Sequence, residues 1–96
     1  MDFQRNARQL HDQVRGLLPW PAAVTELGGK RCKVLSTSVL EGHSNRQPGA
    51  VLAADKGGIQ ICCGDGSILR IDRLQPDGGK PMAAADYLRG HPIAVD

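Results

Sequence analysis

Histidines and carboxylates are the side chains that most often carry acid–base chemistry, and this sequence keeps them apart. The three histidines are His11, His43 and His91, and none has a partner at the spacing of a catalytic pair or a metal site. The ten aspartates and glutamates include no Asp-x-Asp or other paired-carboxylate motif. Distant residues can still converge in space, but the spacing itself predicts no catalytic residue and no metal ligand.

The cysteines are too few and too irregularly spaced for a disulfide framework. Cys32, Cys62 and Cys63 cannot all pair, and they lack the Cys-x-x-Cys spacing of a zinc site. Free cysteines are commonly buried. We therefore expect three reduced packing residues in a reducing compartment.

One glycine motif resembles part of a phosphate-binding loop. Gly64-x-Gly66 would need a third glycine where Leu69 stands, and no helical pattern follows it. The flanking alternation of apolar and polar residues instead predicts a tight hairpin turn. No Gly-x-x-x-x-Gly-Lys motif occurs, which excludes a P-loop.

Basic residues at the edges of predicted turns are the group for which we predict binding chemistry. Lys30, Arg31 and Lys33 begin a predicted strand, and Lys80 follows a glycine pair. A second group of candidate phosphate contacts is Arg15, Arg70 and Arg89. The net charge is only +2, so a phosphate-binding patch must be local. Ordinary solubilising charge is the alternative for each residue taken alone.

Aromatic residues are too few to stack a row of single-stranded bases. The chain has only Phe3, Trp20 and Tyr87. We expect Phe3 and Trp20 to lie in the core or between the helix and the sheet. Contacts to any bound RNA should therefore be mainly to its backbone and shape.

The residues that could position these cations begin with one amphipathic segment. Apolar residues recur at spacings of three and four between residues 2 and 18, which predicts a helix there. Asp2 is a plausible N-cap, and Pro19 ends the helix. On the polar face, Arg8, Asp12 and Arg15 are spaced to form a row of ion pairs.

After this segment the pattern changes to short apolar runs separated by glycine pairs. We expect strands at residues 22–27, 31–40, 49–55, 59–63 and 67–74. In 59–63, Ile59, Ile61 and Cys63 should face the core, with Gln60 and Cys62 on a wet face. The facing of strand 31–40 is undecided. A short helix should cover residues 82–89, with Gly90 at its left-handed C-cap. Five short strands predict an all-β barrel or sandwich.

The length of 96 residues fits one domain, 1–96. No apolar run approaches the roughly 18–20 residues needed to cross a bilayer, and the N-terminus is not signal-like. We therefore expect a soluble cytoplasmic protein without a membrane partner.

Two stretches carry a resemblance to a known family. The first is Val14-Arg15-Gly16-Leu17-Leu18-Pro19-Trp20-Pro21-Ala22-Ala23. The second comprises Pro48-Gly49-Ala50-Val51-Leu52, Gly58-Ile59, Cys63-Gly64-Asp65-Gly66, Leu74-Gln75-Pro76, Lys80-Pro81-Met82, Asp86-Tyr87-Leu88 and Arg89-Gly90. In order and spacing they cover nearly the whole chain, which resembles the C-terminal domain of methionyl-tRNA formyltransferases.

The resemblance implies a small five-stranded barrel of the oligonucleotide/oligosaccharide-binding (OB) type, at 22–75, with an N-terminal helix and a short C-terminal helix. It also implies a role in holding initiator tRNA. The catalytic residues and the site for 10-formyltetrahydrofolate would belong to an N-terminal Rossmann-type domain in cis, so no catalytic residue and no cofactor is assigned to this domain. Separation from that domain would leave an apolar patch exposed, which favours dimers.

Three positions depart from the family pattern. Leu18 replaces the usual Asn, Ala22 the usual Gly, and Gly79 stands where a first Lys is frequent, so only Lys80 is carried over from that motif. Two alternatives stay open: a structural domain of a sugar-nucleotide formyltransferase, and a freestanding OB-like interaction module.

Overall fold

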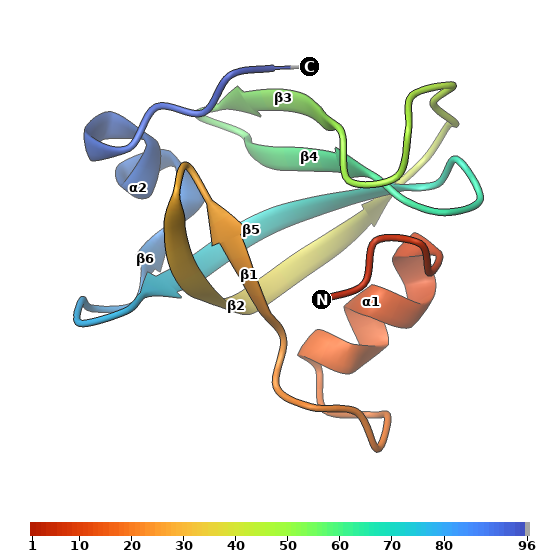
Figure 1. The fold of residues 1–96 in the computed structure, drawn as a ribbon, viewed down its shortest axis with the longest axis horizontal. Coiled ribbons are helices and arrows are strands. Elements are labelled where there is room, and N and C mark those ends of the chain that lie inside the picture. The colour runs from red at the N-terminus through yellow and green to blue at the C-terminus, as the bar shows by residue number, and fades with distance from the viewer. Residues whose placement is uncertain (96) are drawn as a thin grey trace.

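A computed structural model describes residues 1–95, and strands make up most of its regular structure (Figure 1). In chain order the elements are α1 (Ala7–Val14), β1 (Val24–Leu27), β2 (Lys30–Leu40), β3 (Val51–Asp55), β4 (Gly58–Cys62), β5 (Ile68–Pro76), β6 (Met82–Ala83) and α2 (Ala84–Gly90). All five predicted strands are present, with ends shifted by no more than two residues. The two-residue β6 was not predicted.

The strands form one antiparallel sheet in the order β1-β2-β5-β4-β3, and β6 pairs with β5 off this path. The sheet curls into an open half-barrel, with α1 against one end and α2 against the other (Figure 1). Among the described residues, the edge strand β1 pairs only with β2 and the edge strand β3 only with β4. The all-β fold with two short helices, consistent with a small OB-like domain, is therefore confirmed.

The undecided facing of strand 31–40 has a local cause. The pairing of β2 with β5 shifts between Val34 and Ser36 and again between Ser36 and Thr37, which marks a β-bulge. Cys32 and Val34 are buried before the bulge, and Thr37 is buried after it. One strict alternation cannot describe a strand whose phase changes midway.

The helix predicted for residues 2–18 is shorter at both ends. Asn6 is its N-cap: the Asn6 side chain accepts from the Gln9 N–H at 2.8 Å, and the Asn6 N–H donates to the Gln9 side chain at 3.1 Å. This capping box satisfies the backbone N–H groups of Asn6 and Gln9, which favours a helix start at Asn6 over one at Asp2. Asp2 instead lies in a turn and accepts from the Gln4 N–H. The helix ends before Gly16, whose φ is +74°.

The segment before α1 is fastened to the β4–β5 turn. The Gly64 N–H donates to the Arg5 carbonyl at 2.9 Å, and the Ala7 N–H donates to the Ser67 hydroxyl at 2.8 Å. A Cβ at Gly64 would lie 1.7 Å from the Gln4 carbonyl oxygen, so only glycine allows this approach. Gly64-x-Gly66 is thus a turn, as predicted, and also a docking point for the N-terminal segment.

Two apolar clusters fill the molecule. The larger lies inside the curled sheet and includes Ile59, Ile61 and Ile71, and the smaller joins α1 to Cys63 and Leu69. Both clusters contact Phe3, as expected for a residue between helix and sheet. The alternation in residues 59–63 predicted correctly that Ile59, Ile61 and Cys63 face the core.

The prediction that Cys62 lies on a wet face is wrong. Cys62 is fully buried, because the loop before β3 covers it: the Gly49 N–H donates to the Cys62 carbonyl, and the Cys62 Sγ contacts the Arg46 carbonyl. Cys32 and Cys63 are buried as well, and all three cysteines are free, as predicted.

The second helix begins two residues later than predicted, because Met82 and Ala83 pair with β5 as β6. Gly90 is the last residue of α2 and His91 is the C-cap. The glycines with positive φ do not include Gly90, so the predicted left-handed cap is wrong.

Gly64→Ala should destabilise the fold by about 1–3 kcal/mol, because its Cβ must displace the backbone at Gln4. Gly90→Ala is the matched control. No atom lies within 4 Å of its Cβ, so stability should stay unchanged or rise by up to about 1 kcal/mol. Urea unfolding of both variants measures the difference, and equal stabilities would contradict the proposed docking of the N-terminal segment.

Candidate nucleic-acid interface

The β1–β2 hairpin places three of the predicted cations at the start of β2. Its turn is Gly28-Gly29, with φ of +62° and +82°, which suits a two-residue turn between twisted strands. Arg31 pairs with Glu26, and Lys33 pairs with Val24. Lys30, Arg31 and Lys33 are all exposed.

The β5–β6 turn brings the fourth cation to the same end of the sheet. Lys33 of β2 pairs with Gln75 of β5, and the Asp77 N–H donates to the Arg31 carbonyl at 3.0 Å. The Gln75 side chain reaches along the turn and donates to the Gly79 carbonyl at 3.1 Å, next to exposed Lys80. Both turns lie on the left of Figure 1, away from α1.

We call Lys30, Arg31, Lys33 and Lys80 the basic end. Among residues 1–95, none of these four side chains has a carboxylate oxygen within 4.0 Å, although Glu26 and Asp77 lie on neighbouring backbone. Their charges are therefore available to an external anion. A local patch of this kind needs no large net charge.

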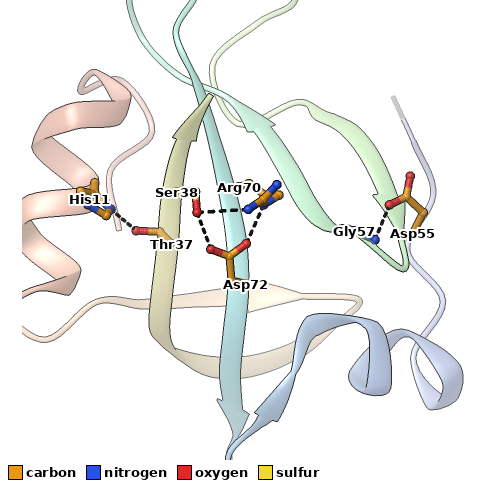
Figure 2. A network of polar contacts seen from close by, with 7 residues as sticks. All are labelled: His11, Thr37, Ser38, Asp55, Gly57, Arg70 and Asp72. Carbon is orange, nitrogen blue, oxygen red and sulfur yellow. Dashed lines mark hydrogen bonds and ion pairs between the residues drawn. The ribbon is translucent and has the colours of Figure 1, made fainter. Parts of the chain in front are cut away.

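Arg70 is in a different situation. Its Nε lies 2.6 Å from Asp72 Oδ1, and its Nη2 donates to the Ser38 hydroxyl at 3.2 Å. The Ser38 hydroxyl in turn donates to Asp72 Oδ2 at 2.6 Å (Figure 2). This network joins β2 to β5 and neutralises the guanidinium, so Arg70 is not brought to the basic end.

The two remaining candidates are each ion-paired on a helix. Arg15, at the end of α1, lies 3.8 Å from Asp12, which Arg8 approaches to 3.7 Å; this is the predicted row. Arg89 on α2 lies 3.5 Å from Asp86 in an exposed pair, with the Arg89 side chain 82% accessible. Exposed pairs of this type hold a cation weakly. Arg15 is the C-cap of α1, which packs at the other end of the sheet from the basic end (Figure 1). Arg89 lines a pocket with Asp55 and Lys56 of the β3–β4 turn.

Two contacts had no signal in the sequence. The His11 Nδ1 lies 2.7 Å from the hydroxyl of buried Thr37 (Figure 2). The Arg5 guanidinium lies 3.8 Å from the centroid of the Trp20 ring, a cation–π geometry. Trp20 is half-buried against this cation and belongs to neither apolar cluster of residues 1–95, so it is not found packed in the core or between helix and sheet as predicted.

The described residues offer little for metal or nucleophilic chemistry. No group of three or more His, Cys, Asp or Glu side chains in residues 1–95 is placed to hold a metal ion. Burial, and secondarily the neighbouring Cys62, raises the pKa of the Cys63 thiol to about 11. A thiol that keeps its proton is a poor nucleophile.

Comparison with known proteins shows the family of this chain. The family model of the formyl transferase C-terminal domain matches residues 1–92. The chain belongs to this family. A methionyl-tRNA formyltransferase of Trichlorobacter lovleyi is 44% identical over 95 residues, which are 99% of this chain and 29% of that protein. The Pelobacter propionicus enzyme of the same name is 46% identical over 94 residues, 98% of this chain and 28% of its own.

This formyl transferase C-terminal domain therefore spans less than a third of the length of these relatives. Among solved structures, HypX from Aquifex aeolicus in complex with tetrahydrofolic acid is similar, with a TM-score of 0.59 and 21% identity over 81% of this chain and 14% of that one. That likeness supports the fold. No helix in residues 1–95 is long and apolar enough to span a membrane.

The raised pKa of Cys63 predicts a loss of stability in alkali. Below pH 9.0 the thiol is protonated whether the chain is folded or not, and the stabilisation is complete. Between pH 9 and 11 the unfolded thiol ionises first, so the free energy of unfolding should fall, by about 2–3 kcal/mol at most. Urea unfolding at several pH values measures this. Cys63→Ala should lack that part of the pH dependence, and parallel profiles would contradict the burial effect.

Proposed function

We propose that this domain holds initiator tRNA for a methionyl-tRNA formyltransferase and that the formyl transfer takes place on another domain. Family membership and the curated relatives support the enzyme class. The basic end supports the tRNA role, because its four cations are gathered, exposed and without an internal ion pair among residues 1–95. This last observation carries the proposal.

The proposed contact is with RNA phosphates. Lysine and arginine side chains on two adjoining turns can follow a phosphate backbone without reading bases, which suits a chain with three aromatic residues. Because Lys33 and the β5–β6 turn are connected through paired backbone, their relative position is set before RNA arrives. Arg89 lines a pocket with Lys56 of the β3–β4 turn and does not join this group, and Arg70 contributes to the sheet.

The domain would then act by positioning the tRNA. Binding one part of the tRNA raises the effective concentration of its acceptor end at a separate active site. In the proposed parent enzyme, an N-terminal Rossmann-type domain in cis uses 10-formyltetrahydrofolate to formylate the methionine amino group, in the cytoplasm. Dimerisation of the isolated domain stays a prediction.

Single changes of Lys30, Arg31, Lys33 and Lys80 to Ala test this function. Each should weaken binding of initiator tRNA to the 96-residue chain and reduce the slope of log K against log salt concentration by about 0.7–0.9 for each lost phosphate contact. Filter binding between low and moderate salt measures the slope. Unchanged slopes in all four variants would remove the tRNA assignment.

Lys56→Ala is the charge-matched control. Lys56 is exposed in the β3–β4 turn, which a hydrogen bond from the Gly57 N–H to Asp55 closes at 2.8 Å (Figure 2). It should leave both affinity and slope unchanged. Heparin serves as a polyanion control: binding heparin as tightly as tRNA would favour a merely basic structural domain, such as that of a sugar-nucleotide formyltransferase.

A further inference from the structure

The tip of the β1–β2 hairpin is fastened to α2. The Tyr87 hydroxyl donates to the carbonyl of Leu27, the last residue of β1, at 2.6 Å. This buried bond joins residues 60 positions apart. Leu27 is only 4% exposed, so water cannot readily replace the hydroxyl. The bond thus fixes the strand end that leads directly into the basic end.

The chain after α2 also contacts this tip. A Cβ at Gly28 would lie 3.4 Å from Ile93 Cγ1 and 3.6 Å from the His91 carbonyl oxygen, which are ordinary van der Waals distances, so the tip lies beside the C-terminal segment. The His91 ring stacks on the Tyr87 ring, with centroids 4.4 Å apart and planes 4° from parallel. These contacts orient the Tyr87 ring and leave its hydroxyl directed at the hairpin.

The hydroxyl stays protonated at any pH used for RNA binding. Burial raises the pKa of Tyr87 to about 12, and the nearby Cys32 thiol adds to this. The hydrogen bond to the Leu27 carbonyl therefore does not change with pH in the neutral range.

The β1–β2 hairpin needs support beyond its own strand pairing. Cys32 is the first β2 residue with a partner on β5, so Lys30 and Arg31 have only β1 beside them in the sheet. Apart from strand pairing, the bond from the Asp77 N–H to the Arg31 carbonyl supports this segment. A two-stranded ribbon without other packing is marginally stable in water. The position of the two cations therefore depends on what holds the tip.

We propose that Tyr87 is a positioning residue for RNA binding: its hydroxyl holds the β1–β2 hairpin so that Lys30 and Arg31 meet phosphates in a preset geometry. This inference rests on the proposed function. A hairpin already held in its binding geometry loses less conformational freedom when RNA binds, which favours affinity without a contact from Tyr87 itself. The α2 segment is then part of the tRNA-holding device.

A double-mutant cycle tests the inference on the 96-residue chain. Tyr87→Phe removes the hydroxyl and keeps the ring, and it should weaken binding of initiator tRNA by about three- to tenfold. In a Lys30→Ala/Arg31→Ala background the same change should alter affinity by no more than about twofold, because the residues it positions are gone. A purely structural role would give the same loss in both backgrounds.

Thr37→Val is the matched control for stability. It removes one side-chain hydrogen bond, to His11, at the other end of the sheet, and it should leave tRNA affinity unchanged. Amide hydrogen exchange at Gly29, Lys30 and Arg31 should quicken in Tyr87→Phe and not in Thr37→Val. Should Tyr87→Phe fail to fold, Ile93→Ala takes its place in the cycle, because Ile93 contacts the same tip.

The outcomes separate the two proposals. If Lys30→Ala/Arg31→Ala weakens tRNA binding but Tyr87→Phe has no effect, or has an equal effect in both backgrounds, the positioning role is wrong and the proposed function stands. If Lys30→Ala/Arg31→Ala itself leaves tRNA binding unchanged, the positioning role is wrong as well, and the proposed function falls only if Lys33→Ala and Lys80→Ala also leave binding unchanged.

Discussion

The pairing of β2 with β5 is the constraint on which the rest of this molecule depends. β5 is central: it pairs with β2, β4 and β6, so its register sets the position of most of the sheet. One end of the β2–β5 ladder, at Lys33 and Gln75, carries the basic end, and the other end, near Thr37 and Leu69, receives α1. Burial of apolar side chains on the inner face fixes this register, because a slip of one residue would turn the core outward.

The same ladder divides the cations into two kinds. Arg70 lies in the middle of β5, where Asp72 and Ser38 are close enough to bind its guanidinium, and it becomes part of the sheet. Lys33 lies near the end of the ladder, where its partner Gln75 directs its amide along the turn to Gly79. The neighbouring side chains decide this, and not the place in the strand, because Arg73, also within β5, is exposed and has no carboxylate partner among residues 1–95.

Periodicity was sufficient to predict the elements, but pairing and capping lie beyond it. The inward side chains of β4 followed from alternation, whereas the bulge near Ser36 depends on how β2 pairs with β5, which the pattern of one strand does not contain. The apolar period continued past the true ends of α1. Phe3, in the turn before the helix, packs against both apolar clusters, whereas Leu17, after the helix, is exposed. The turns predicted from the sequence indicated the residues of the basic end. The ion pair that takes Arg70 out of the candidate group could be found only from the fold.

The cations of the basic end are exposed and have no internal ion pair within residues 1–95, so the fold does not depend on them. Surface changes of this kind usually alter stability by less than about 0.5 kcal/mol. Such a patch can therefore gain or lose charge while the barrel stays intact. Tyr87 is different, because it belongs to both the core and the support of the hairpin. Changes at individual surface residues can thus alter the strength of electrostatic binding, but the position of the binding residues depends on the core.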